Sequence, residues 1–73
     1  PWDRVQTHAS LRPFLIEETF ELLEQLDLGD SDKVKEELGD VLFQVLFHAR
    51  LAQEEGRWDV GDVGRVLSSK LVR

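Results

Sequence analysis

Four glutamates fall on one side of the helix expected in the first third of the chain: Glu17, Glu18, Glu21 and Glu24. At about 100° per residue they share an arc of roughly 120°. No lysine or arginine lies three or four positions from any of them, so nothing on the helix relieves their mutual repulsion. Glu18 also borders the leucine face of this helix, where an unpaired carboxylate is costly. A run of this kind is ordinarily a solvated face, but these two features favour carboxylates that bind a cation.

A second polar stripe follows the next expected helix, at Glu37, Asp40, Gln44 and His48. Glu37 and Asp40 are three residues apart, which is also the spacing of Glu18 and Glu21. If the two helices pack antiparallel, these pairs meet as an all-oxygen cluster of four carboxylates. Such a cluster suits Mg²⁺ or Mn²⁺, and a set without thiolates and poor in histidine argues against zinc. The simpler alternatives are a hydrogen-bond ladder between the helices or an exposed seam, and for His48 we favour these over a ligand role.

The first helix must position the glutamates, and it is expected to follow Ser10, a good N-cap residue, with Pro13 tolerated in the first turn. Apolar residues recur at helical spacing from Leu11 onward and form one broad face. The run ends at Gly29, because glycine readily adopts the left-handed conformation that closes helices. The preceding segment, from Pro1 to Ala9, is polar and is predicted to be a loop.

Two further helices complete the predicted fold. Ser31 or Asp32 is expected to cap the second helix, which stops near Gly56. Asp59, with Asp62 three residues later, opens a third and shorter helix. No stretch alternates polar and apolar residues in the manner of a strand. The fold class is therefore all-α, a helical hairpin followed by a short third helix.

The second helix is too apolar to be covered by one neighbour. From Val41 to Ala52 it is apolar around almost its whole circumference, and such a helix is buried on most sides. The chain has 73 residues, which allows a single domain over residues 1–73 with a small core that buries only about 60% of the unfolded surface. We therefore expect two hairpins to pair into a four-helix bundle across a dimer axis.

The composition excludes several classes of function. Fifteen acidic and nine basic residues give a net charge of −6, the wrong sign for a protein that binds nucleic-acid phosphates. The chain has no cysteine, which excludes disulfides, thiolate zinc sites and cysteine nucleophiles. Apolar runs are short and interrupted by charge, and no signal-peptide pattern is present. We expect no nucleic-acid or membrane partner and a cytoplasmic location.

The carboxylate pairs form a recognisable combined motif. Glu17 to Glu21 read E-E-x-x-E, and Glu37 to Asp40 read E-x-x-D after fifteen intervening residues. The flanks match as well: Pro1-Trp2-Asp3, Gln6-Thr7-His8, Ser10-Leu11 and the run from Glu54 to Asp59. Over essentially the whole chain the sequence resembles the MazG-type nucleoside triphosphate pyrophosphohydrolases. An isolated E-E-x-x-E is frequent in acidic helices, whereas the paired motif with these flanks is specific.

The resemblance implies an all-α, Mg²⁺-dependent enzyme, with Mn²⁺ as a substitute ion, that converts a nucleoside triphosphate to the monophosphate and pyrophosphate. The family motif, matched residue by residue, implies that the metal ligands are Glu18, Glu21, Glu37 and Asp40. Glu17 would be a further catalytic carboxylate, either another ligand or a group just outside the ligands. Glu17 or Glu24 would orient or deprotonate the attacking water, and the sequence leaves the choice between them open. Removal of non-standard nucleotides is a role compatible with this chemistry.

The resemblance also implies how substrate and partners are bound. Lys70 and Arg73 are the expected phosphate contacts, and Trp2 is expected to stack on the base or to close a helix end. Related chains continue beyond this segment into a basic, histidine-containing tail, so the 73 residues are expected to be part of a longer polypeptide. A homodimer or tetramer is the expected assembly. The alternative function is a non-catalytic dimerisation or nucleotide-sensing module with the same fold.

Overall fold

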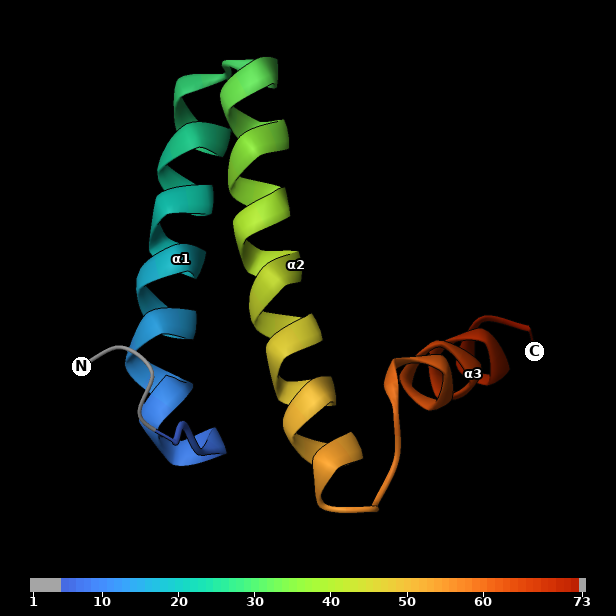
Figure 1. Ribbon diagram of the computed structural model, residues 1–73. Helices are drawn as coiled ribbons and strands as arrows, with labels where there is room; N and C mark the ends of the chain where they lie inside the picture. Colours follow the sequence, from blue (N-terminus) through green and yellow to red (C-terminus); the bar gives the residue numbers. More distant parts are fainter. Residues whose placement is uncertain (1–4, 73) are drawn as a thin grey trace.

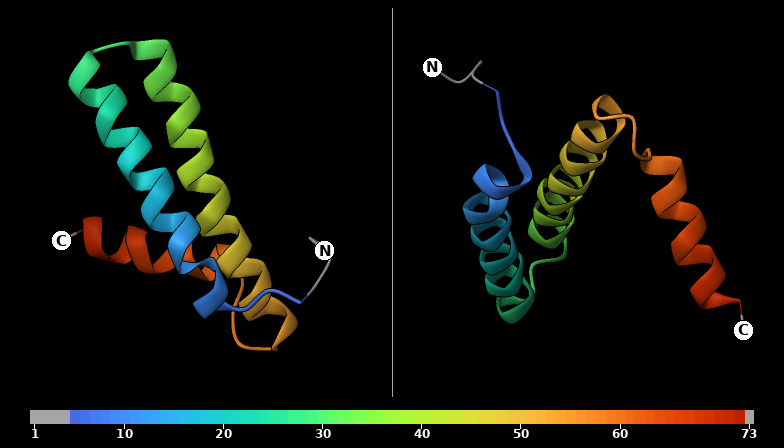
Figure 2. Two further views of the ribbon diagram at one scale, coloured as in Figure 1. Left: turned by 90° about the vertical axis from the view of Figure 1, so that its left-hand side faces the viewer. Right: turned by 90° about the horizontal axis from the view of Figure 1, so that it is seen from below.

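The computed structural model describes residues 5–72 and contains three helices: α1 (His8–Leu28), α2 (Ser31–Glu54) and α3 (Val60–Leu71). Helices α1 and α2 form an antiparallel hairpin, and α3 leaves the far end of α2 and points away from it (Figure 1). The right-hand view of Figure 2 shows that α3 stands apart from α1, with α2 between them. Residues 5–72 contain no strand, and the all-α prediction is confirmed.

Helix α1 begins earlier than the sequence pattern predicts. Its N-cap is Thr7, whose side chain accepts a hydrogen bond from the backbone N–H of Ser10, while the Ser10 hydroxyl accepts one from the N–H of Thr7. The prediction of Ser10 as the cap, with a loop up to Ala9, is therefore wrong, because Ser10 serves as the reciprocal residue of a capping box. Pro13 consequently lies in the second turn of the helix, where it removes one hydrogen bond of the ladder.

The turn between α1 and α2 is short and sharply defined. Gly29 closes α1 in the left-handed conformation, with φ of 77°, as predicted. The N-cap of α2 is Asp30, whose carboxylate accepts a hydrogen bond from the N–H of Lys33 at 3.2 Å. The prediction placed this cap one or two residues later, at Ser31 or Asp32, and is wrong because all three residue types are good caps. The closing glycine leaves Asp30 as the first residue that can cap the next helix.

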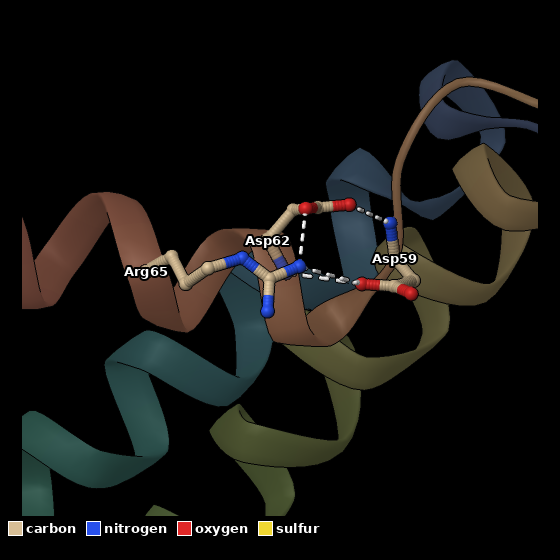
Figure 3. Close-up of polar contacts among 3 residues, drawn as sticks. All are labelled: Asp59, Asp62 and Arg65. Atoms are coloured by element: carbon tan, nitrogen blue, oxygen red, sulfur yellow. Dashed lines mark hydrogen bonds and ion pairs between the residues drawn. The ribbon is translucent and has the colours of Figure 1, made fainter.

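Helix α3 is held at its start by a network that the sequence predicts in part. Gly56, with φ of 74°, turns the chain after α2. Asp59 begins the third helix as predicted, and it forms a capping box with Asp62 in which each side chain accepts from the other's backbone N–H. The guanidinium of Arg65 lies between the two carboxylates (Figure 3). Its hydrogen bond, together with the one from the backbone of Asp59, lowers the pKa of Asp62.

Replacing Asp59 by alanine is expected to lower the free energy of unfolding by about 1 kcal/mol, because it removes the N-cap of α3. The change should appear as a lower urea midpoint measured by circular dichroism. Asp32→Ala is the matched control, since Asp32 is exposed in the first turn of α2 and makes only a 3.9 Å ion pair with Lys35, worth little on a surface. Equal losses in the two variants would contradict a capping role for Asp59.

One copy of the chain has little interior. Among the described residues, the buried apolar side chains are Leu11, Ala49 and Ala52. The Cα radius of gyration is 14.4 Å, whereas a compact chain of this length has a radius of about 11 Å. The accessible surface is 5986 Å², against about 4,600 Å² for a compact protein of this mass. The expectation that one hairpin leaves α2 uncovered is confirmed.

Across residues 5–72, no helix has both the length and the apolar character required to cross a bilayer.

Candidate metal centre

Four carboxylates from two helices meet near the middle of the hairpin. Glu18 and Glu21 come from α1, and Glu37 and Asp40 come from α2. Each offers one oxygen, and these four oxygens all lie within 4.8 Å of one another. The structure thus brings together the four residues that the sequence predicts as metal ligands.

The turn at Gly29 sets the register that makes this meeting possible. Glu21 lies eight residues before Gly29 and Glu37 eight residues after it. Glu18 and Asp40 are both eleven residues from the same glycine. Residues equidistant from a tight turn face each other in an antiparallel hairpin, and an i,i+3 pair occupies one face of a helix. Each glutamate of α1 therefore meets one carboxylate of α2.

Burial makes this cluster unfavourable when no cation is bound. Three of its members are half-buried and Asp40 is exposed. Glu18 Oε2 and Glu37 Oε1 have almost no contact with solvent and no hydrogen-bond partner among residues 5–72. The pKa of Glu18 is raised by burial and then by the charges of Glu21 and Asp40. Burial and the charge of Glu21 likewise raise the pKa of Glu37.

A divalent cation fits this donor set. Buried acceptors without partners are rare in folded proteins, and a cation satisfies several of them at once. The donors are all carboxylate oxygens, which Mg²⁺ and Mn²⁺ prefer over softer ions. Four negative charges also exceed what one divalent ion neutralises, so the cluster has the charge to hold one or two ions.

Other residues predicted for the site lie elsewhere. Glu17 and Glu24 are exposed on α1 and line, with Glu21, a hollow beside the cluster, but they are not members of it. Lys70 is exposed on α3, which contacts α2 and makes no contact with α1 within the described chain. Trp2 and Arg73 lie outside the described residues.

The polar stripe of α2 continues from the cluster toward the N-terminal end of α1. There the Nδ1 atoms of His8 and His48 are 2.6 Å apart, and the two rings are parallel within 7°. Gln44, between His48 and Asp40 on the stripe, is buried, and its Oε1 has no partner within residues 5–72. The expected hydrogen-bond ladder is therefore incomplete. The partnership of His8 was not predicted, because the sequence was read as a loop there.

The histidine pair makes the stability of the protein depend on pH. Burial, followed by the charge of His8, lowers the pKa of His48. An unfolded histidine takes up its proton near pH 6.5, so the unfolded chain binds more protons than the folded chain just below that pH. The contribution of His48 to stability is therefore expected to fall as the pH drops below about 6.5.

Comparison with a His48→Gln variant isolates this effect, because glutamine keeps a polar side chain beside His8 but does not titrate. Unfolding free energies measured between pH 8 and pH 5 should fall more steeply for the wild type than for the variant. The raised pKa values of Glu18 and Glu37 act in the opposite direction in both proteins and cancel in the difference. Parallel curves would show that His48 does not carry the pH dependence.

Comparison with known proteins decides the family. The MazG nucleotide pyrophosphohydrolase domain matches residues 6–73, a range that includes all three helices and the four clustered carboxylates. The chain belongs to the MazG family. The resemblance inferred from the paired E-E-x-x-E and E-x-x-D motifs is thereby confirmed.

Several MazG relatives are similar over nearly the whole chain. The nucleoside triphosphate pyrophosphohydrolase/pyrophosphatase MazG of Thermotoga maritima is 57% identical over 72 residues, covering 99% of this chain. The nucleoside triphosphate pyrophosphohydrolase of Escherichia coli K12 is 49% identical over 73 residues, covering all of this chain. An uncharacterized Bacillus subtilis protein, YabN, is 52% identical over 73 residues. The chain spans 28% of the length of the first two relatives and 15% of the third.

Proposed function

We propose that this chain carries the catalytic carboxylates of a nucleoside triphosphate pyrophosphohydrolase, which converts a nucleoside triphosphate and water to a nucleoside monophosphate and pyrophosphate. The observation that carries the proposal is the convergence of Glu18, Glu21, Glu37 and Asp40, with four oxygens within 4.8 Å. The relatives from Thermotoga maritima and Escherichia coli are named as nucleoside triphosphate pyrophosphohydrolases, which supports the same reaction. Non-standard or damaged nucleotides are included among the proposed substrates.

The four carboxylates are proposed to hold Mg²⁺, for which Mn²⁺ can substitute. When bound there, the ion would neutralise charge on the triphosphate and would lower the pKa of the water that attacks phosphorus. Burial raises the pKa of Glu18 and of Glu37, and a cation bound between these carboxylates would favour their charged forms. Asp40 is the exposed member of the cluster, and we propose that substrate reaches the ion from its side.

The proton of the attacking water must pass to a base beside the cluster. Glu17 and Glu24 meet the positional requirement, because both line the hollow that Glu21 shares on α1. Their exposed carboxylates can accept the proton and release it to solvent. Either glutamate fits the role of base. For binding the phosphates of the substrate, Lys70 and Arg73 remain the residues that we propose.

The functional unit is proposed to be a dimer of hairpins, in which four helices form one bundle. The accessible surface of one copy exceeds that of a compact protein of its mass by about 1,400 Å². A stable interface typically buries about 800 Å² per partner, so the uncovered surface is large enough for one. A second copy would cover the apolar side of α2 and leave the carboxylates between α1 and α2.

The test of the reaction is pyrophosphate release from a panel of standard and non-standard nucleoside triphosphates, with Mg²⁺ and with EDTA. The panel should be run on this chain and on a version extended at both ends. Metal-dependent release of pyrophosphate and monophosphate supports the proposal. Orthophosphate as the first product would place cleavage elsewhere in the triphosphate, and no turnover by either version would favour a non-catalytic dimerisation or nucleotide-sensing module.

A further inference from the structure

Gln44 is the one buried polar residue within residues 5–72 that the proposed mechanism does not use. Its exposed fraction is 7%, lower than that of any clustered carboxylate. The amide oxygen Oε1 is buried and accepts no hydrogen bond from the described part of the chain. An unpartnered acceptor of this kind is costly in a protein interior, whereas an apolar side chain of the same shape would carry no such cost. The contacts within residues 5–72 give this amide oxygen no partner that would explain a glutamine at this position.

Gln44 lies on the same face of α2 as two of the four carboxylates. Gln44 follows Asp40 by four residues and Glu37 by seven, so all three lie on one face of the helix. Long side chains in a helix lean toward its N-terminus and over the residue four positions earlier. The preferred rotamers of a helical glutamine therefore bring the amide of Gln44 over the turn that carries Asp40, one of the four clustered carboxylates.

The unpartnered oxygens in this part of the hairpin have one property in common. Glu18 Oε2, Glu37 Oε1 and Gln44 Oε1 are all hydrogen-bond acceptors, and all are buried. Another acceptor cannot satisfy them, and no donor from residues 5–72 does so. A cation with its hydrating water satisfies acceptors of both kinds, since amide and carboxylate oxygens are both ligands of hard divalent ions.

We propose that Gln44 Oε1 is a fifth, uncharged oxygen of the cation site formed by Glu18, Glu21, Glu37 and Asp40. This inference rests on the proposed metal-dependent function and extends its ligand set by one residue. A neutral oxygen adds a contact to the ion without adding to the mutual repulsion of four carboxylates, which already raises the pKa of Glu18 and Glu37. Gln44 would bind the ion or the water next to it, and its role does not require contact with the nucleotide.

The test is Mn²⁺ binding, followed by electron paramagnetic resonance and by calorimetry, for the wild type, Gln44→Leu and Gln53→Leu. Loss of a residue that supports a metal site typically weakens binding by about 10–100-fold, and we expect a weakening in this range for Gln44→Leu. The metal-free Gln44→Leu protein should be as stable as the wild type or more stable, because the buried acceptor is gone. Gln53→Leu, an exposed site on the same helix, should leave Mn²⁺ binding unchanged.

The outcomes separate this inference from the proposed function. If Gln44→Leu binds Mn²⁺ as tightly as the wild type does, the inference is overturned and the four-carboxylate site remains. If metal-free Gln44→Leu is less stable than the wild type while its affinity for Mn²⁺ is unchanged, Gln44 has a packing role and the inference is likewise overturned. Absence of Mn²⁺ binding in the wild type would overturn the proposed metal site itself. A Gln44→Glu variant adds a check, since a fifth carboxylate should lower metal-free stability and enlarge the stabilisation that Mn²⁺ provides.

Discussion

Replacing Asp40 by asparagine is expected to reduce Mg²⁺-dependent pyrophosphate release by at least about a hundredfold. Metal-ion catalysis contributes several kcal/mol to transition-state stabilisation, and each tenfold change in rate corresponds to about 1.4 kcal/mol. Asparagine keeps the size of the side chain and one oxygen but removes one of the four charges that hold the ion. The loss should be larger at limiting Mg²⁺ than at saturating Mg²⁺, and a rate titration with the metal measures it.

The same substitution should leave the metal-free fold intact or make it more stable. The charge of Asp40 raises the pKa of both Glu18 and Glu37, so its removal relieves repulsion within the cluster. Thermal melts with and without Mg²⁺ test this, because a ligand that binds only the folded state raises the melting temperature. The wild type should gain stability with Mg²⁺ and Asp40→Asn should gain much less.

Asp32→Asn is the matched control for both measurements. Asp32 is also on α2 but is exposed, lies outside the carboxylate cluster and forms only a weak pair with Lys35. Its substitution should change neither turnover nor the response to Mg²⁺. An identical metal response in the wild type and in Asp40→Asn would remove Asp40 from the set of ligands.

The carboxylate cluster could be predicted from the sequence because helical spacing and one tight turn, together with antiparallel packing of the two helices, determine its geometry. Helical spacing places Glu18 with Glu21 and Glu37 with Asp40, and Gly29 sets the register between the pairs. Each of these signals is carried by a few neighbouring residues. The family motif consists of the same residues, so the resemblance and the periodicity predict one site.

The features that the sequence did not reveal depend on competition or on contacts between distant residues. Thr7 and Ser10 are both good caps, and only the reciprocal hydrogen bonds of the capping box assign the cap to Thr7. His8 and His48 are forty residues apart, and their contact follows from the packing of α1 against α2. The burial of Gln44 is a property of the same packing, and no pattern of residue types indicates it.

Replacing Leu42 by aspartate is expected to dissociate the proposed dimer and to lower the melting temperature. One side of α2 carries an apolar strip of Leu38, Leu42, Val45 and Leu46, all of them exposed in a single copy. At about 100° per residue this strip lies on the side of α2 away from Asp40, so a second copy can cover it without obstructing the cluster. Leu42 is 54% exposed and would become buried there.

Burying a polar group without a partner costs about 2–7 kcal/mol, and burying an unpaired carboxylate costs more. Leu42→Asp should therefore weaken dimerisation at least about a hundredfold. Light scattering at micromolar concentration should give twice the 8.4 kDa chain mass for the wild type and the single mass for the variant. Phe43→Asp is the matched control. Phe43 is also 54% exposed, but it lies on the side of α2 that carries Glu36, Arg50 and Glu54, where a new charge remains in water.

The two variants together distinguish a dimer from a merely exposed apolar face. If a second copy covers the strip, the Leu42→Asp protein should lose stability to the extent that its dimer dissociates, because subunits of an obligate dimer have little stability alone. The loss should then diminish as protein concentration rises, whereas Phe43→Asp should show no such dependence. A wild-type protein that is monodisperse at 8.4 kDa would contradict the bundle, and α2 would then have to be covered by residues beyond this hairpin.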